Sequence, residues 1–175
     1  MPRMTKKQLG EFLNGAHVAK LSVVRADGSP FVAPVYYQWD GTVFYIVGRK
    51  KASWAENIRR EPRVTLLIDE PKYPYPRVTI QGKAKVVGTE LSDWVKIGEK
   101  QVKRYFGSQA GISYFEGSMD QPRLTIEITP TKITSWISPP ESVLKEKPML
   151  DWHPKYYEPG TKWYAQYETM RKTTR

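Results

Sequence analysis

The sequence contains no cysteine, and among its 175 residues only His17 and His153 are histidines. The absence of cysteine excludes disulfides, thiolate catalysis and cysteine-ligated zinc. With so few histidines, a metal site built from protein side chains alone would depend on carboxylates. We therefore expect no metal centre, and we assign neither histidine a role as general base.

Long apolar segments are also missing. No apolar run approaches the ~20 residues that a helix needs to span a bilayer. The first residues, MPRMTKKQLGEF, lack the apolar core of a signal peptide. These features predict a cytoplasmic protein that does not associate with membranes.

The composition that remains is that of a folded, basic protein. Hydrophobic residues make up 39% and aromatic residues 13% of the chain, and the length suits one domain with an added tail. Lys and Arg outnumber Asp and Glu by 28 to 18, which gives a formal charge of +10. This excess favours anionic partners such as phosphate groups or nucleic acid, although it can also serve only to keep the surface soluble.

The first third of the chain predicts a helix followed by strands. Thr5 and Gln8 have capping-box spacing at the start of TKKQLGEFLNG, and Gly15 can end this helix. Residues 17–48 contain three β-rich segments separated by ADGSP and WDG. Because Asp-Gly pairs favour tight turns between strands, we predict an antiparallel meander here.

The next part of the chain, to residue 137, predicts an alternation of helices and strands. Gly82 lies within a β-rich run and indicates a bend or bulge there. Apolar residues at helical spacing predict a longer helix in ELSDWVKIGEKQVKRYFG. The segments and their predicted states are a short helix at 53–60, strands at 63–70 and 77–88, a helix at 90–107, and a strand or bent pair of strands at 122–137.

The C-terminal part has a different character. Residues 139–175 show no clear period but are rich in aromatic and basic residues, and TKWYAQYETMRK has a helical composition. A disordered tail rarely holds so many aromatics. We therefore expect one domain over 1–138 and an extension over 139–175 that packs on this domain or on a partner subunit. The alternative is a tail that stacks on single-stranded nucleic acid.

A cluster of cations stands between an apolar strand, VFYIV, and the short helix. Arg49, Lys50 and Lys51 follow the strand, and Ser53 opens the helix. The start of a helix offers free backbone N–H groups to an anion, and a guanidinium can hold a phosphate through two bonds. This pattern predicts a phosphate-binding turn. Alternatively, Ser53 and Glu56 form a capping box and the cations are solvated.

An ordered series of segments resembles the pyridoxamine 5'-phosphate oxidase-like, FMN-binding split β-barrel family. The matching segments are VVRADGSPFVAPVYYQWDG, GRKKAS, NIRREPRVTLLI and VTIQGKAKVV, within residues 5–137. The resemblance implies a mainly β fold with flanking helices, a six-stranded antiparallel split barrel over 1–138. It also implies a homodimer with two flavin sites at the subunit interface.

The resemblance also implies which residues bind the cofactor. In this family the turn after the third strand holds the phosphate, a preceding segment lies beside the isoalloxazine ring, and a later strand contributes further contacts. Trp54 departs from the pattern, because many relatives carry Lys or Arg near this position. Carried over to this sequence, the cofactor-binding residues are Pro34, Val35, Tyr36, Arg49, Lys50, Lys51, Ser53, Gln81 and Lys83. No catalytic residue is assigned.

The resulting hypothesis is an FMN-dependent oxidoreductase that acts on an unidentified small molecule. The alternatives are a deazaflavin (F420)-dependent reductase and a non-enzymatic FMN-binding storage or sensor protein, while haem binding and nucleic-acid binding rank below them. The acidic tail of F420 suits a basic protein. Oxidation of pyridoxamine phosphate itself is disfavoured, because the C-terminal segment YYEPGTKWYAQYETMRKTTR lacks the paired Arg and His residues of that substrate motif.

Overall fold

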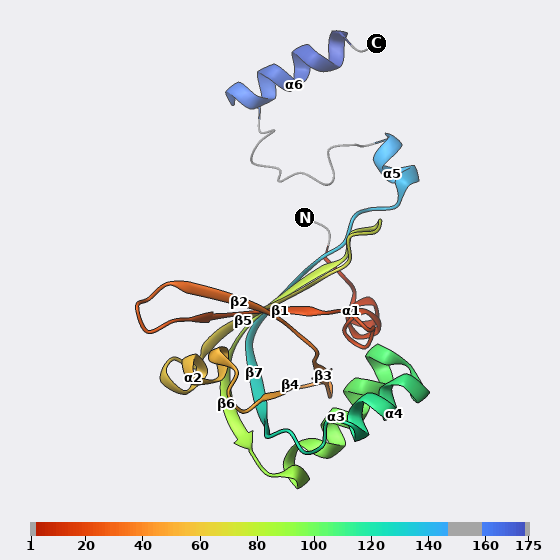
Figure 1. The fold of residues 1–175 in the computed structure, drawn as a ribbon. Coiled ribbons are helices and arrows are strands. Elements are labelled where there is room, and N and C mark those ends of the chain that lie inside the picture. The colour runs from red at the N-terminus through yellow and green to blue at the C-terminus, as the bar shows by residue number, and fades with distance from the viewer. Residues whose placement is uncertain (1–2, 147–158, 174–175) are drawn as a thin grey trace.

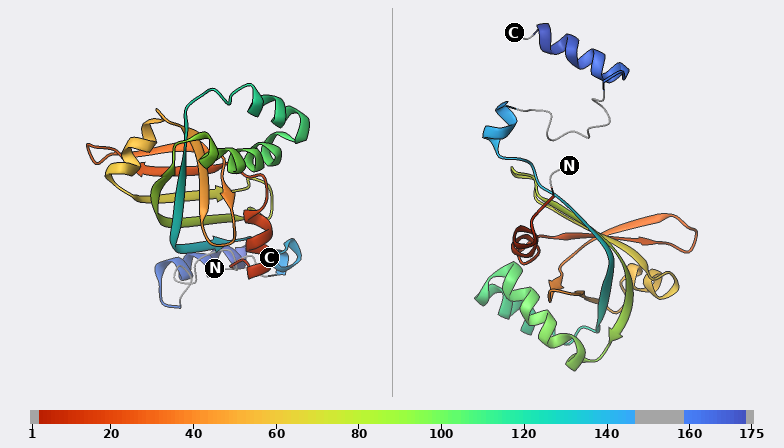
Figure 2. Two further views of the ribbon diagram at one scale, coloured as in Figure 1. Left: turned by 90° about the horizontal axis from the view of Figure 1, so that it is seen from below. Right: turned by 180° about the vertical axis from the view of Figure 1, so that it is seen from behind.

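A single antiparallel sheet forms the centre of the computed structural model, which describes residues 3–146 and 159–173. The sheet curls into a half-barrel (Figures 1 and 2). In their order across the sheet, the strands are β2 (Pro30–Val35), β1 (Ala19–Val24), β5 (Arg63–Asp69), β6 (Arg77–Gly88), β7 (Arg123–Trp136), β4 (Phe44–Arg49) and β3 (Gln38–Trp39). The predicted split-barrel class is confirmed, but with seven strands instead of six, because the two-residue β3 pairs with β4.

Some of the helices connect strands of the sheet, and others precede the first strand or follow the last one. In chain order they are α1 (Lys6–Leu13), α2 (Ser53–Arg60), α3 (Leu91–Phe106), α4 (Ser108–Glu116), α5 (Glu141–Glu146) and α6 (Lys162–Thr173). Helices α3 and α4 form a hairpin between β6 and β7 (Figure 1). The helices predicted near residues 5, 53 and 90 are confirmed, and so is the helix in TKWYAQYETMRK. Helix α4 was not predicted.

The predicted meander is right at both turns, but its middle strand is divided into β2 and β3, which lie apart. Both Asp-Gly turns form, since the Asp27 carboxylate accepts the Ser29 N–H and the Asp40 carboxylate accepts the Val43 N–H. However, β2 pairs with β1 only, whereas β4 pairs with β3 and with the distant β7. Each turn therefore joins neighbouring strands, β1 with β2 and β3 with β4, but the two hairpins lie at opposite ends of the sheet.

Tyr37 accounts for this break between β2 and β3. Its side chain is completely buried, its hydroxyl donates to the Leu13 carbonyl oxygen at 2.9 Å, and its ring lies 5.8 Å from that of Phe44. Burial raises the pKa of the Tyr37 phenol above its usual value. The chain turns inward here to complete the core, so β2 cannot continue directly into a strand paired beside it.

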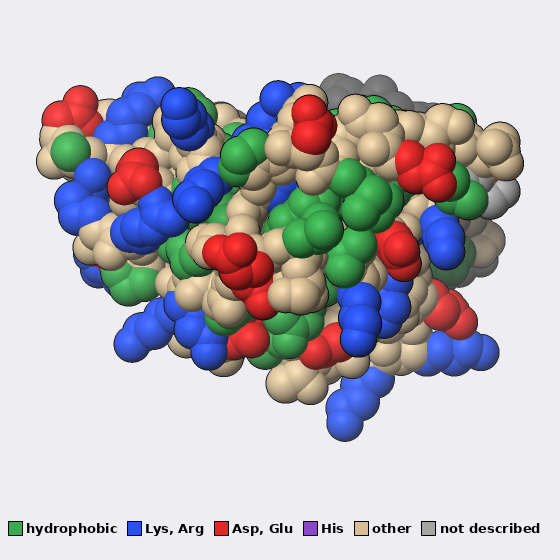
Figure 3. Space-filling view, turned by 60° about the horizontal axis from the view of Figure 1, so that its bottom comes forward, with side chains coloured by type: hydrophobic (Ala, Val, Ile, Leu, Met, Phe, Trp, Pro, Cys, Tyr) green, Lys and Arg blue, Asp and Glu red, His purple; other side chains and the backbone are tan. Residues whose placement is uncertain are grey.

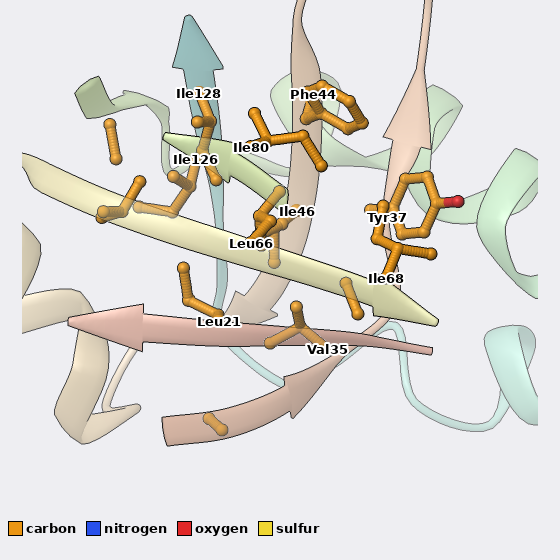
Figure 4. Packing of buried hydrophobic residues seen from close by; sticks show 14 of the residues in the cluster. Leu21, Val35, Tyr37, Phe44, Ile46, Leu66, Ile68, Ile80, Ile126 and Ile128 are labelled. Carbon is orange, nitrogen blue, oxygen red and sulfur yellow. The ribbon is translucent and has the colours of Figure 1, made fainter. Parts of the chain in front are cut away.

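The core lies inside the curl of the sheet. Along β1 and β5, alternate side chains are buried, as expected for strands with one face toward the core. Each fully buried Leu or Ile side chain contributes roughly 1.5–3 kcal/mol to stability. Figure 4 shows this cluster, with side chains from several strands and the β2–β3 link converging: Leu21, Val35, Tyr37, Phe44, Ile46, Leu66, Ile68, Ile80, Ile126 and Ile128. The predicted bulge in β6 is confirmed between Gln81 and Gly82.

Arg104 ties α3 to the rest of the domain. Its guanidinium donates to the carbonyl oxygens of Leu13, at 2.6 Å, and Gly15, at 2.9 Å. The same group lies 4.9 Å from the centre of the Tyr37 ring. Because the carbonyl end of a helix carries partial negative charge, a cation at the end of α1 is favourable. Arg104 thus joins α1, α3 and the segment after β2 at one point.

His17 lies close to this junction and packs as a structural residue. Its ring stacks on Phe12 at 4.3 Å, and the carboxylate of Glu70 lies 3.8 Å from Nδ1. Burial lowers the pKa of His17, while Glu70 opposes this effect. Among the described residues, no helix is both long and apolar enough to cross a bilayer.

The C-terminal extension is described only in part. Helices α5 and α6 belong to it, whereas His153 and the aromatic residues Trp152, Tyr156 and Tyr157 lie outside the described residues. The packing of this extension on the barrel or on a partner subunit therefore stays a prediction.

We expect Arg104→Gln to destabilise the domain, because it removes charge-assisted hydrogen bonds to the Leu13 and Gly15 carbonyls. Such bonds contribute about 1.5–3 kcal/mol each, so the melting temperature should fall by roughly 5–15 °C in thermal unfolding. Arg63→Gln is the control, because among the described residues the side chain of this exposed arginine has its hydrogen bonds and ion pair with the nearby Glu61, and surface pairs contribute little. Equal shifts in the two variants would contradict the anchoring role of Arg104.

Candidate functional site

The outer face of β4 and β7 forms the floor of a pocket. Phe44 and Ile46 point into the barrel core, so Val47 and Arg49 point outward by strand alternation. Val47 packs against the cluster that joins α3 and α4, which contains Trp94, Val102 and Phe115. The helical hairpin therefore covers this part of the sheet from outside.

The pocket itself lies between the hairpin and the ends of β2 and β4, with a volume of about 220 Å³. Its aromatic lining residues are Tyr36, Trp54, Trp94, Phe106, Tyr114 and Phe115. Polar side chains enter it from three elements, namely Arg49, Gln101 and Arg123. Figure 3 shows hydrophobic side chains gathered on the side of the molecule where the hairpin lies, with basic and acidic side chains around them. Planar apolar walls with a few fixed polar groups are typical of small-molecule sites.

Two arginines stand opposite each other at this pocket. Arg49 on β4 is the direct partner of Arg123 on β7. The Arg123 Nη2 donates to the Ser118 hydroxyl at 2.7 Å, and the guanidinium lies 5.3 Å from the centre of the Trp94 ring. Like charges at opposed positions of a sheet repel each other. Since neither arginine has an ion pair with a carboxylate among the described residues, this end of the pocket is positively charged.

Trp54 closes the barrel end of the pocket by packing against Gly48. A Cβ atom at Gly48 would lie 2.3 Å from the Trp54 Cη2 atom, which is far closer than two carbon atoms can approach. Gly48 therefore provides the space for this indole. The Trp54 ring thus forms part of the wall of the pocket.

The cationic turn lies beside the pocket. Arg49 lines it, whereas Lys50 and Lys51 are exposed on the turn that follows. The Lys50 N–H donates to the Pro122 carbonyl oxygen at 2.9 Å, which fixes the turn against the start of β7. The alternative capping box is wrong, because Ala52 is the N-cap of α2 and Glu56 bonds to Arg59 instead. Ser53 is the first residue of α2 and is exposed.

Gln81 and Lys83 lie on β6, away from this pocket. They border a second groove, of about 510 Å³, formed by β1, β5 and β6. Lys83 stands opposite Thr129 on β7, six residues from Arg123, or roughly 20 Å along the strand. One chain alone therefore does not bring these two residues to the pocket, and their contact with a cofactor stays a prediction that needs a second subunit.

The residues at the end of β2 and just after it are divided between the pocket and the core. Pro34, Val35 and Tyr36 border the pocket, although the Val35 side chain is buried in the barrel core. Tyr36 is 39% exposed and packs on Tyr105, with 4.4 Å between the ring centres, while Tyr37 belongs to the core. Only Tyr36 of the two tyrosines can therefore contact a ligand here.

Sequence reasoning missed the part of the pocket that the helical hairpin contributes. Apolar residues at helical spacing predict helix α3, but nothing local shows that its apolar stripe, which includes Trp94 and Val102, covers β4. Gln101, Tyr114, Phe115 and Arg123 were not assigned to a site. The buried amide of Gln101, which donates to the Tyr45 carbonyl oxygen at 3.0 Å, is a polar residue inside that helical stripe and was the one available signal.

The curled antiparallel sheet with its covering helices defines a split-barrel protein. The sequence model described as pyridoxamine 5'-phosphate oxidase matches residues 5–137, and the chain belongs to this family. A comparison with curated protein sequences found no match.

Solved structures with the same fold carry different descriptions. A conserved hypothetical protein of Mycobacterium tuberculosis is 24% identical, with a TM-score of 0.65 over 77% of this chain and 85% of its own. An F420 reductase is 23% identical, with a TM-score of 0.57 over 70% and 93%. HutZ, the haem storage protein of Vibrio cholerae, is 18% identical, with a TM-score of 0.60 over 76% and 96%. At these identities the likeness concerns the fold.

We expect Gly48→Ala to destabilise the protein, because the added methyl group must displace Trp54. Overpacking of this kind costs about 1–3 kcal/mol of unfolding free energy, measurable by urea unfolding. Gly10→Ala is the matched control. Nothing lies within 4 Å of a Cβ atom there, and alanine in a helix is better by about 0.5–1 kcal/mol. A Gly48→Ala protein as stable as the wild type would show that the indole moves freely.

Proposed function

We propose that the protein is a flavin-dependent oxidoreductase that acts on a small molecule. The observation that carries this proposal is the aromatic pocket that meets Arg49 at the start of the cationic turn. Membership of the pyridoxamine 5'-phosphate oxidase family supports the redox class. The chain offers no cysteine nucleophile, and a bound flavin would itself supply hydride or electron transfer.

The residues of the pocket fit an FMN-like cofactor. A planar ring can lie against Pro34, Val35 and Tyr36, and its phosphate can reach the turn that Arg49 begins. There Lys50, Lys51 and the hydroxyl and backbone N–H of Ser53 would complete the anion site. The task of these residues is to bind and orient the ring, while the helical hairpin excludes water from one side of it.

We propose further that a homodimer completes the site. A volume of about 220 Å³ is smaller than the roughly 300–1,000 Å³ that usually encloses a drug-sized ligand, so one chain would surround only part of a flavin. The second groove, with Gln81 and Lys83, lies on a different face. A partner subunit that presents this groove to the pocket would bring the remaining predicted cofactor residues to the ring.

F420 is the first alternative cofactor, and a storage or sensor role without turnover is the second. The +10 charge and a structural neighbour described as an F420 reductase favour the deazaflavin alternative. Haem ranks lower despite the HutZ neighbour. Of the described residues that line the pocket, none is His, Cys or Met, the ligands that most often hold haem iron.

The cofactor proposal predicts that replacing Arg49, Lys50 and Lys51 with alanine lowers FMN or F420 affinity at least tenfold with an unchanged far-UV spectrum. Each charge-assisted bond from these side chains to the phosphate supplies a substantial part of the binding free energy, and the variant cannot form them. Titrations of FMN, F420 and haem into the apo protein provide the measurement. Alanine at the exposed Lys6, Lys7 and Lys72 removes the same charge elsewhere and is the control.

Equal reductions of affinity in the two triple variants would mean that only the net charge of the protein matters. Full cofactor binding by the variant with alanine at Arg49, Lys50 and Lys51 would refute the assignment of this turn as the phosphate site. Turnover is tested separately with NADH, NADPH and reduced F420. Tight binding of FMN without turnover by any of these donors would favour the storage or sensor role.

The dimer proposal predicts a sedimentation mass of about twice the 20.3 kDa of one chain. It also predicts that Lys83→Glu weakens cofactor binding, because the introduced carboxylate would face the anionic cofactor across the interface. Lys83 lies far from the pocket of its own chain, so this effect requires a partner. A monomer that still binds cofactor, or unchanged affinity in the variant dimer, would contradict the shared site.

A further inference from the structure

Positive charge gathers on the side of the molecule that α2 and the β1–β2 hairpin form. Figure 3 shows Lys and Arg side chains gathered at the left, with fewer acidic side chains among them, and Figure 1 places α2 and this hairpin on the same side. The cations are exposed and come from the hairpin turn, the cationic turn and α2. We call this surface the basic face, and its residues are Arg25, Lys50, Lys51, Arg59 and Arg60.

Most of the basic face lacks a counter-ion. Arg59 forms an ion pair with Glu56. The other four cations have no ion pair with a carboxylate among the described residues. None of the three arginines of the basic face lines the pocket, so the proposed flavin site does not account for them. Neighbouring charges of one sign repel one another, and an anion that contacts several of them relieves this repulsion.

Arg60 holds α2 and the hairpin together. Its guanidinium donates to the carbonyl oxygen of Val24, the last residue of β1. The guanidinium of Arg25, the next residue, lies 4.7 Å from the centre of the Phe31 ring on β2. The hairpin projects past β5, because β1 pairs with β5 only over residues 20–22 but with β2 to its end (Figure 1). The cations therefore have fixed positions on a projecting surface.

The spacing of the cations along α2 suits a DNA duplex. Lys50 and Lys51 precede this helix, and Arg59 and Arg60 are its last two residues. A helix of eight residues is about 12 Å long, and the major groove of B-DNA is about 12 Å wide. The two ends of α2 can therefore contact the phosphate backbones on either side of this groove. Glu56 lies between these ends, where the groove has no phosphate.

The basic face carries no apolar anchor. Among the described residues, none of the exposed large hydrophobic side chains belongs to α2, to the hairpin turn at 25–29 or to the cationic turn. Insertion into a bilayer needs an apolar surface, and the centre of a protein–protein interface is depleted of charged residues. Protein–DNA interfaces are more polar and much more positively charged. The composition of the basic face therefore favours a sugar–phosphate backbone over lipid or protein.

We propose that the basic face binds double-stranded DNA through its phosphates, with α2 lying across the major groove. This binding is a second function, separate from the cofactor pocket. Phosphate contacts position a protein on the duplex but carry no sequence information. Duplexes of different sequence should therefore bind with similar affinity.

The test measures the binding of a fluorescein-labelled DNA duplex of about two helical turns by fluorescence anisotropy. Contacts from the four cations without a counter-ion predict that log K falls with log salt at a slope of about −3 to −4. The affinity should then fall by roughly 100-fold between about 50 and 200 mM salt. A single strand with the same number of phosphates should bind at least tenfold more weakly, because only the duplex places two backbones on either side of a groove.

Arg25→Gln combined with Arg60→Gln should weaken duplex binding at least tenfold at low salt. The double variant loses two phosphate contacts, so the salt slope should become shallower by about 2. The matched control combines Arg3→Gln with Arg77→Gln, which removes the same charge from two exposed arginines. Arg3 precedes α1, and Arg77 begins β6 at the end of this strand that pairs with the end of β5. The control should keep the wild-type salt slope.

A footprint on the wild-type protein tests the same surface without a substitution. The duplex should protect Lys50 and Lys51 from an amine-reactive acetylating reagent, as measured by mass spectrometry. Lys6 and Lys7, which are exposed on α1, should remain reactive. This measurement decides if the double variant does not fold, and unprotected Lys50 and Lys51 would overturn the proposal.

Other results would also overturn the proposal. Equal losses of affinity in the double variant and its control would mean that only the net charge of the protein matters. Equal binding of the single strand would refute the contact across a groove. If vesicles of phosphatidylglycerol displace the duplex at an equal concentration of phosphate, the basic face is a site for anionic surfaces in general and its assignment to DNA is wrong.

Titration of the same proteins with FMN and F420 separates this proposal from the proposed function. Neither Arg25 nor Arg60 lines the pocket, so the double variant should bind the cofactor as the wild type does. Protein that binds the duplex but no flavin or F420 would retain the DNA site and refute the oxidoreductase function. Protein that binds flavin but no duplex at low salt would do the reverse.

Discussion

The contact of the Arg104 guanidinium with the end of α1 is the constraint on which the site depends. It fixes α3 at its C-terminal turn through the carbonyls of Leu13 and Gly15. Tyr105, the next residue, donates its hydroxyl to the His17 carbonyl at 2.9 Å, and burial raises the pKa of this phenol. Because α3 carries one wall of the pocket, these polar bonds help to fix where that wall stands. A cation at a helix terminus thereby positions aromatic side chains of the pocket wall.

The two faces of β4 have different tasks, because one packs in the barrel core and the other lines the pocket. Phe44 and Ile46 are buried in the barrel core, whereas Val47 and Arg49 are turned toward the hairpin. A change of one residue in register would exchange these roles, so the packing of the core also specifies where the positive charge appears. Gly48 stands between Val47 and Arg49 and leaves room for the Trp54 indole. The pocket is thus formed on a strand whose position the core already determines.

Local patterns predicted most elements of this fold, and long-range contacts explain what they missed. The capping box of Thr5 and Gln8, the bulge at Gly82 and the amphipathic α3 each depend on neighbouring residues, and each was predicted. The pairing of β4 with β7 joins residues far apart in the chain, and no turn signal encodes it. Helix α4 was missed because its N-cap is Gly107, without a side-chain capping bond, and because SQAGISYFE contains Gly111, which helix propensity disfavours. Gly111 is nevertheless needed, since a Cβ atom there would lie 2.8 Å from the Val102 carbonyl oxygen.

The difference between local patterns and long-range contacts also explains which charged residues of the site can be recognised from the sequence. Arg49, Lys50 and Lys51 form a run that is plain in the sequence, although only Arg49 lines the pocket. Arg123 stands alone before an alternating strand and looks like an ordinary surface residue. Its significance comes from three tertiary facts, namely the opposed Arg49, the Trp94 ring and the missing acceptor at Nε among the described residues. A charged side chain indicates a ligand when the folded protein gives it no partner of opposite charge. The sequence alone does not show which charged side chains will lack such a partner.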